Sequence, residues 1–246
     1  VSDSNNKKIH TMPNDYFTFK GFTVRQDRCA MKVGTDGVLL GAWARSPGRR
    51  ILDIGTGTGL IALMMAKRYT GAHITAIDIE PGACAQTREN AVAAGMADRI
   101  SVANCRLQDF DGGGACFDTI VCNPPFYSGT PRSKSPERTL ARSASSLPAG
   151  ELFGHAAHLL TDDGQMSLIV PAACFGTFDA EAAMAGLWPH RVCALRTVAR
   201  KPVSRYLLAY GKQRTDGVER SEECIMGTDS GRSAWYAALT EDFYLG

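Results

Sequence analysis

A strand, a glycine-rich turn and a helix follow one another early in the chain, and this succession limits the possible folds more than any other stretch. RRILDIG (49–55) is short, apolar and closed by glycine, and LIALMMAKRY (60–69) has helical composition. The same succession returns as HITAIDI (73–79) and GACAQTRENAVAAG (82–95). Strands that alternate with helices favour a parallel sheet covered by helices on both faces. We therefore predict an α/β fold.

The rest of the chain continues the sheet. We predict five further strands and two helices: strands RISVANC (99–105), FDTIVC (117–122), QMSLIVP (165–171), RVCALRTVA (191–199) and SRYLLAYGK (204–212), and helices ELFGHAAHLL (151–160) and DAEAAMAGL (179–187). TDDG (161–164) is expected to form a turn, and the last two strands an antiparallel closing pair. Upstream, YFTFKGFTVRQ alternates apolar and polar residues around Lys20-Gly21, which predicts a hairpin.

Length and composition bound the class of protein. At 246 residues the chain suits one large α/β domain, so we expect a polar tail at 1–16 and a single domain at 17–246. Its start lacks the apolar core of a signal peptide, and no run approaches the roughly 18 apolar residues of a membrane span. The eight cysteines form no Cys-x-x-Cys pair, which favours reduced thiols. We expect a cytoplasmic protein that binds no membrane.

A metal site is not expected. His155 and His158 stand three residues apart on a predicted helix, but no third ligand candidate is near them in the sequence. Packing is therefore the favoured interpretation of this pair.

DIGTGTG (53–59) lies between a strand and a helix. Its glycines allow a tight turn and a close approach of the backbone to a ligand at the helix N-terminus. The Gly-x-Gly-x-Gly spacing differs from the pyrophosphate-binding Gly-x-Gly-x-x-Gly, and no Gly-Lys-Ser/Thr follows. Asp78 ends the next strand, where a carboxylate can accept hydrogen bonds from ribose hydroxyls. S-adenosylmethionine, an adenosyl ligand without a pyrophosphate, fits both the glycine spacing and the position of Asp78. The cofactor-binding residues predicted here are Asp53, Gly55, Gly57, Gly59, Asp78 and Ile79.

Asn123-Pro124-Pro125-Phe126 closes the strand at 117–122. A residue before proline is steered into an extended conformation, and Pro124 keeps its carbonyl as an acceptor while having no N–H to donate. The side-chain oxygen of Asn123 and the carbonyl of Pro124 can hold the two hydrogens of a planar amine and direct its lone pair at a methyl sulfonium. Phe126 would stack on a flat base, with help from Tyr127. The alternative is that the prolines merely end the strand.

Charge is unevenly distributed along the chain. Residues 1–50 carry 9 Lys and Arg against 4 Asp and Glu, and residues 126–150 carry 4 against 1. Residues 51–125 and 151–246 are each three charges negative, with 5 against 8 and 9 against 12. Such segregation suits a polyanionic substrate, or else a mobile serine-rich loop with incidental charge. The predicted substrate-binding cations are Arg132, Lys134, Arg138 and Arg142.

DIGTGTG together with NPPF resembles the amino-methylating class of S-adenosylmethionine-dependent methyltransferases. A narrower resemblance rests on FTFKGFTVRQDRCAMKVGTDGVLLGAWA (17–44), RTLARSASSL (138–147) and ALTEDFYLG (238–246). These stretches are similar to the bacterial tRNA(Val) adenine-N6-methyltransferase family. The resemblance implies a Rossmann-like, seven-stranded class I methyltransferase fold, with tRNA as the partner and the adenosine 3′ of the anticodon as the target.

The resemblance also implies roles that the residues alone leave open. Gln26, Lys32, Thr35 and Asp36 would border the methionine end of the cofactor, within a hairpin and lid segment at 17–50, and Leu107 and Gln108 would lie beside its adenine. Arg106 stands where many relatives have an aspartate that binds the adenine amino group, so that contact falls to the backbone or to Asp109. Ser143 similarly stands where relatives often have histidine.

Two other functions use the same motifs. A protein-glutamine N5-methyltransferase places an amide in the same Asn-Pro-Pro geometry, and a non-catalytic RNA-binding protein could keep the fold. The basic segments at 1–50 and 126–150 favour a nucleic acid over a protein substrate. The glycine spacing disfavours a dinucleotide oxidoreductase. The sequence indicates no obligate protein partner.

Overall fold

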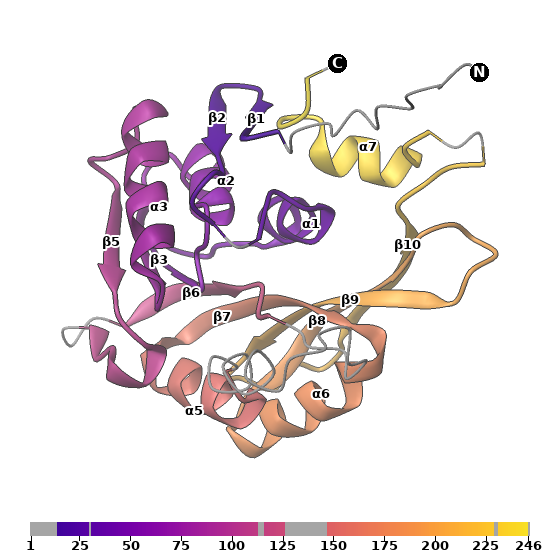
Figure 1. Ribbon diagram of the computed structural model, residues 1–246. Helices are drawn as coiled ribbons and strands as arrows, with labels where there is room; N and C mark the ends of the chain where they lie inside the picture. Colours follow the sequence, from indigo (N-terminus) through magenta and orange to yellow (C-terminus); the bar gives the residue numbers. More distant parts are fainter. Residues whose placement is uncertain (1–13, 30, 113–115, 126–146, 229–230, 246) are drawn as a thin grey trace, which may run out of the picture.

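A single sheet of eight strands runs through the computed structural model of the chain, which describes residues 14–29, 31–112, 116–125, 147–228 and 231–245 (Figure 1). The strand order is β10-β8-β9-β7-β6-β3-β4-β5. The strands are β3 (Arg50–Ile54), β4 (His73–Asp78), β5 (Ile100–Asn104), β6 (Phe117–Cys122), β7 (Leu160–Pro171), β8 (Trp188–Arg196), β9 (Val203–Gly211) and β10 (Glu219–Cys224).

The sheet is mostly parallel. β3 pairs in parallel with β4 and β6, β4 with β5, and β6 with β7, whereas β9 runs antiparallel to both β7 and β8. All seven predicted strands are present, and the predicted antiparallel closing pair is β8 and β9. The Rossmann-like α/β fold is confirmed.

Two features of the sheet differ from the sequence-based expectation. β10 joins in parallel beside β8 as an eighth strand. Its sequence ERSEEC is polar and exposed along most of its length, so it carries none of the apolar alternation by which strands are recognised. The prediction of a turn at TDDG (161–164) is wrong. β7 passes through it, and the pairing with β6 shifts there, from Phe117 with Leu160 to Thr119 with Gln165.

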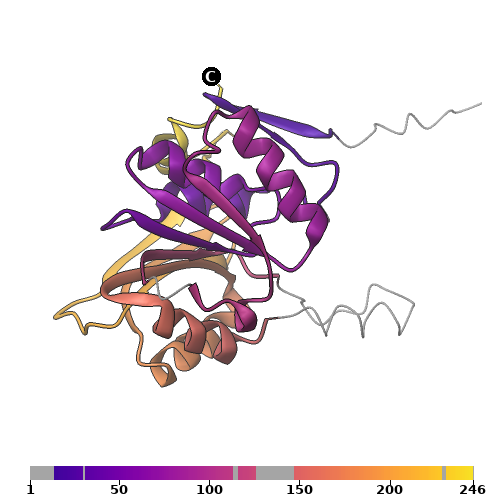
Figure 2. The same cartoon turned by 90° about the vertical axis from the view of Figure 1, so that its left-hand side faces the viewer.

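Helices cover both faces of the sheet (Figures 1 and 2). On one face, α1 (Thr35–Trp43), α2 (Leu60–Arg68), α3 (Pro81–Ala93) and α7 (Ala234–Thr240) cover the sheet, and on the other face α5 (Ala149–Leu159) and α6 (Phe175–Met184) do so. Two short 3₁₀ helices, η1 (Leu107–Asp109) and η3 (Ala172–Cys174), follow β5 and β7. Each face has its own buried apolar cluster.

The sequence did not indicate α1, because its two glycines lower helix propensity. Both glycines face α2. A Cβ at Gly41 would lie 2.7 Å from the Sδ of Met64, and one at Gly37 would lie 3.0 Å from a methyl carbon of Leu60. The glycines therefore let two buried helices approach closely, which fixes the segment that leads into β3.

The predicted hairpin is confirmed as β1 (Tyr16–Phe19) and β2 (Phe22–Arg25), an antiparallel pair joined through Lys20-Gly21. Gly21 has a φ of 87°, in the left-handed region that glycine tolerates. Aromatic side chains Phe19 and Phe22 stack at 5.1 Å between ring centroids and belong to the core on the α1 face.

All eight cysteines are free thiols. Among the helices within the described residues, none is both long and apolar enough to cross a bilayer.

Candidate active site

The carboxyl ends of β3, β4 and β6 meet at one edge of the sheet. Ile54, the last residue of β3, is in register with Ile77 of β4 and with Cys122 of β6. The glycine turn that follows Ile54 therefore lies between Asp78 and Asn123. In open α/β sheets, ligands bind in the crevice outside the carboxyl ends of the strands.

The three glycines of the turn have φ values of 71° at Gly55, 57° at Gly57 and 80° at Gly59. A Cβ at Gly55 or Gly57 would meet nothing within 4 Å, whereas one at Gly59 would lie 2.9 Å from Thr87. The first two glycines thus satisfy a left-handed backbone and leave the space beside them open to a ligand. Gly59 is instead required by the close packing of the start of α2 on α3.

Asp78 fastens this turn to the end of β4. Its Oδ2 accepts a hydrogen bond from the backbone N–H of Gly57 at 2.8 Å, and its Oδ1 accepts one from the N–H of Glu80 at 2.9 Å. A carboxylate has about four lone-pair positions, so half of its accepting capacity remains. The next residue, Ile79, is 44% exposed and presents an apolar side chain beside the same carboxylate.

Asp53 lies beneath the turn and is buried. Its Oδ2 accepts a hydrogen bond from the hydroxyl of Thr56 at 2.6 Å, while its Oδ1 has no hydrogen-bond partner within the described residues. Burial raises the pKa of Asp53 to about 7, and the neighbouring Asp78 carboxylate adds to the rise against the lowering effect of the Thr56 hydroxyl. The site therefore holds a carboxyl group that favours a nearby positive charge.

The raised pKa predicts a pH dependence of stability. The folded protein holds the Asp53 proton more tightly than the unfolded chain, because the pKa rises from 3.8 to about 7 on folding. The free energy of unfolding must then fall as pH rises through this interval. An Asp53→Asn variant loses this dependence and keeps an acceptor for Thr56, so it should gain about 2 kcal/mol relative to wild type between pH 5 and pH 8. Urea unfolding of both proteins at the two pH values tests this, and a constant difference would contradict it.

Asn123 and the two prolines follow β6 directly, beside the glycine turn. Pro124 is buried, whereas Asn123 is partly accessible and Pro125 is exposed. The other predicted residues of this region lie outside the described residues: Phe126, Tyr127, Arg132, Lys134, Arg138, Arg142 and Ser143.

The chain matches known methyltransferases in sequence. The Methyltransferase small domain family matches residues 31–174. The tRNA1(Val) (adenine(37)-N6)-methyltransferase of Phocaeicola vulgatus is 44% identical over 237 residues, which cover 95% of this chain and 99% of the relative. The enzyme of the same name from Edwardsiella ictaluri is 39% identical, covering 96% of both chains. The chain belongs to this methyltransferase family. The predicted family is thus confirmed.

Structural comparison agrees on the fold of this methyltransferase. A predicted O-methyltransferase from Agrobacterium tumefaciens superposes with a TM-score of 0.64 at 18% identity, covering 85% of this chain and 96% of that chain. At this identity the likeness concerns the fold alone.

Gln26 and Lys32 fix the segment that follows β2 in the methyltransferase. The amide of buried Gln26 donates to the carbonyl of Asn14 at 2.6 Å and accepts from the N–H of Val33 at 2.7 Å. The ammonium of Lys32 donates to the same Asn14 carbonyl at 3.2 Å. Both side chains therefore hold the backbone at Asn14 in place, and Gln26 also holds the backbone at Val33. Burial and the Asp78 carboxylate raise the pKa of Cys29 to about 11. The N–H of Arg28 donates to the Gln86 side chain at 3.1 Å, which places this segment beside α3, the helix that follows Asp78.

Thr35 and Asp36 begin α1. The Asp36 carboxylate accepts a hydrogen bond from Nε of Arg205 at 3.0 Å, so it joins the start of α1 to the start of β9. Thr35 is exposed. The contact of these two residues with a cofactor stays a prediction.

The predicted adenine-side residues follow β5. Leu107 is buried among the apolar side chains of the α5 face, and the Gln108 amide donates to the Glu151 carboxylate. Arg106 and Asp109 are both exposed there. Their contacts with a cofactor also stay predictions.

Sequence reasoning missed three buried polar residues of α3. The Asn90 amide accepts from the N–H of Arg25 and donates to the carbonyls of Arg25 and Thr58, all at 2.8 to 2.9 Å. The Thr87 hydroxyl donates to the carbonyl of Gly57 at 3.0 Å, and Gln86 accepts from the N–H of Arg28. α3 thus ties the segment after the hairpin to the glycine turn. Polar residues three and four positions apart within a helix were the available signal.

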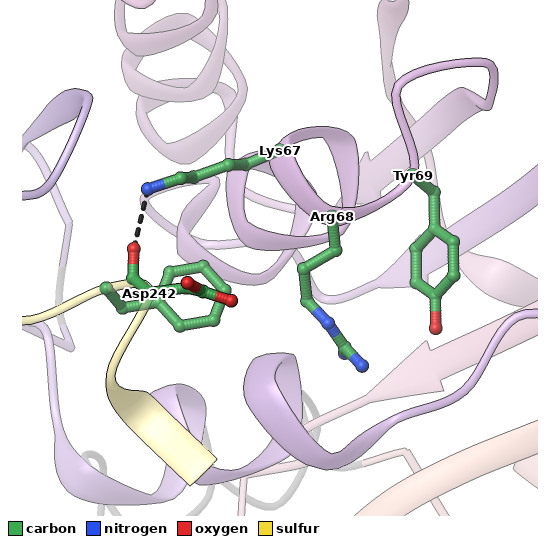
Figure 3. Close-up of a pocket in the computed structure, with 5 residues that line it drawn as sticks. Lys67, Arg68, Tyr69 and Asp242 are labelled. Atoms are coloured by element: carbon green, nitrogen blue, oxygen red, sulfur yellow. Dashed lines mark hydrogen bonds between the residues drawn. The ribbon is translucent and has the colours of Figure 1, made fainter. Parts of the chain in front are cut away.

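A hollow in the surface lies elsewhere, at the far end of α2. This hollow of about 460 Å³ is lined by Lys67, Arg68, Tyr69, Asp242 and Phe243 (Figure 3). Its cations are already engaged. Lys67 donates to the Asp242 carbonyl at 2.6 Å, and Arg68 donates to the carbonyls at the end of α1. The hydrogen bond from Lys67 therefore anchors the segment around Asp242 to α2. The hollow also lies at the end of α2 remote from the glycine turn.

His155 and His158 lie on α5. The described residues contain no group of three His, Cys, Asp or Glu side chains arranged to hold a metal ion.

Proposed function

We propose that this methyltransferase transfers the methyl group of S-adenosylmethionine to N6 of adenine 37 in tRNA1(Val), with S-adenosylhomocysteine as the leaving group. The observation that carries the proposal is the register of β3 and β6, by which an amine-binding motif directly adjoins an adenosyl-binding turn. The names of its relatives support the same reaction and substrate.

The residues present fit S-adenosylmethionine, which supplies an electrophilic methyl group on a sulfonium. The unused lone pairs of Asp78 can accept hydrogen bonds from ribose hydroxyls, and Ile79 can cover one face of the adenine. The open space at Gly55 and Gly57 allows a close approach of the ligand. Asp53 carries an unpartnered buried oxygen, so its carboxylate favours a cationic ligand above it.

The acceptor amine is positioned by Asn123 and Pro124. The adenine N6 lone pair is delocalised into the ring, so the amine is a poor nucleophile until its hydrogens are held out of the ring plane. The Asn123 side-chain oxygen and the Pro124 carbonyl accept these hydrogens and direct the lone pair at the methyl group. No strong base is needed before transfer, because the methylated ammonium loses its proton readily afterwards. We assign Phe126 and Tyr127 to stacking on the base and place the reaction in the cytoplasm.

The proposal predicts N6-methyladenosine at one position of one tRNA. Purified protein, labelled S-adenosylmethionine and unmodified tRNA1(Val) should give labelled N6-methyladenosine on nucleoside analysis. The same transcript with guanosine at position 37 should take up no label. Label that persists in this control would overturn the assigned position.

The same assay separates the two rival functions. Label in the glutamine of an added protein substrate would instead indicate the protein-glutamine methyltransferase. Binding of tRNA without any transfer would indicate a non-catalytic RNA-binding protein.

A further inference from the structure

The turn between β8 and β9, residues 197–202, lies at the same sheet edge as the acceptor motif. β9 runs antiparallel to β7, and Arg205 near its start pairs with Pro171 at the carboxyl end of β7. β7 in turn lies beside β6, which Asn123 follows (Figure 1). Neighbouring strands are about 4.8 Å apart, so β9 and β8 lie roughly 10 and 14 Å from β6 across the sheet. Cys122 is level with Leu168 of β7 and Leu208 of β9, so the turn also lies at least about 10 Å farther along the strands, roughly 20 Å from Asn123 in all. A few nucleotides of RNA span that distance.

This turn is strongly basic. From Arg196 to Arg205 the chain has four cationic residues and no Asp or Glu. Two of them are neutralised where the strands end, since Arg196 pairs with Glu222 at 2.6 Å and Arg205 with Asp36 at 3.0 Å. The other two, Arg200 and Lys201, are exposed. Neither of their side chains has a hydrogen bond or ion pair within the described residues, so both charges are available to a partner.

The turn is also held in one conformation. The guanidinium of Arg196 that binds Glu222 also donates to the carbonyl of Lys201 at 2.7 Å. The N–H of Lys201 donates to the carbonyl of Val198 at 2.9 Å, and proline follows at 202. The two free cations are therefore presented by an ordered backbone, which lowers the entropic cost of binding.

We propose that Arg200 and Lys201 form a second RNA contact, binding backbone phosphates of the tRNA anticodon arm whose adenine lies at Asn123. This inference rests on the proposed function. Arg and Lys side chains bind phosphate oxygens through charge-assisted hydrogen bonds. A protein partner is less suited, because none of the exposed large apolar side chains within the described residues lies in this turn.

A double variant, Arg200→Gln with Lys201→Gln, tests the contact. A matched control is Arg49→Gln with Arg50→Gln. These two exposed cations belong to the basic segment 1–50, but they lie at the amino end of β3, at the sheet edge opposite Asn123, so they are not expected to contact the bound RNA. Binding of unmodified tRNA1(Val) is measured by fluorescence anisotropy over a range of salt concentrations. The KM values for tRNA and for S-adenosylmethionine are determined in the transfer assay, and thermal midpoints check folding.

We expect the turn variant to raise the dissociation constant for tRNA about tenfold and to flatten the slope of log K against log salt by about 1.4, for two phosphate contacts of about 0.7 each. Its KM for S-adenosylmethionine and its thermal midpoint should stay at the wild-type values. The control variant should bind tRNA with the wild-type slope.

An unchanged slope in the turn variant, or an equal loss in both variants, would overturn the proposal. The failure of the proposed function is distinguishable, because wild-type protein would then transfer no methyl group to the tRNA. The slope of log K against log salt for tRNA binding, measured in the same samples, would still show whether Arg200 and Lys201 contact the tRNA. Wild-type protein that neither binds nor methylates tRNA would overturn both proposals.

Discussion

Replacing Asn123 by alanine should lower the kcat of methyl transfer by about 10²- to 10³-fold, the usual cost of removing one polar group that acts on the reacting atoms. The side-chain oxygen of Asn123 is assigned to hold one hydrogen of the acceptor amine, and alanine offers no acceptor. The KM for S-adenosylmethionine should change by less than about twofold, because Asp78 and the glycine turn form the other half of the site. Steady-state kinetics with each substrate varied in turn measures both constants.

An Asn123→Asp variant is the informative comparison. Aspartate keeps an acceptor oxygen at the same distance from the backbone, so it should retain more activity than alanine, losing about tenfold. If alanine and aspartate lose equally, the side chain has only a structural role. If alanine keeps the wild-type kcat, the motif merely ends the strand. Circular dichroism of both variants should match that of the wild type, since Asn123 lies beyond the last residue of β6.

The residues that could be predicted from the sequence are those whose local context decides their geometry. The glycine turn and Asp78 were predicted because strand ends, glycine spacing and carboxylate position are all visible over some 25 residues of chain. Asn123 lies beside them because β3 and β6 are parallel, and the carboxyl ends of parallel strands share one edge. The register of Ile54 with both Ile77 and Cys122 agrees with that reasoning.

Features that depend on distant partners were not predictable in this way. Asp36 and Arg205 are 169 residues apart in sequence and pair only because the fold brings the start of α1 beside the start of β9. The hydrogen bonds of Asn90 to Arg25 and Thr58 likewise join three separate segments. α1 could not be recognised as a helix from the sequence, because Gly37 and Gly41 allow close packing on α2 but lower the helix propensity of the segment. For Asp36 and for α1 a tertiary contact decided the structure and left no periodic signal, whereas for Asn90 the spacing of polar residues along α3 was the only signal.

Replacing Asp78 by alanine should raise the KM for S-adenosylmethionine by at least about 10²-fold. Two hydrogen bonds from ribose hydroxyls to a charged acceptor would be lost, and each such bond contributes about 1.5 to 3 kcal/mol. The N–H of Gly57 would also lose its acceptor, so the turn that approaches the cofactor would be held less firmly. The kcat at saturating cofactor should fall far less, because the acceptor amine is held by Asn123 and Pro124.

The control for this variant must separate cofactor binding from the loss of a backbone anchor. Asp118 provides it, because its carboxylate accepts hydrogen bonds from the N–H groups of Arg49 and Arg50, both at 2.8 Å. It lies near the amino end of β6, at the sheet edge opposite the proposed site. Asp118→Ala should therefore destabilise the protein through the same kind of loss while leaving the KM for S-adenosylmethionine unchanged. A similar rise of KM in both variants would mean that Asp78 acts only by anchoring the backbone, and the ribose contact would have to be abandoned.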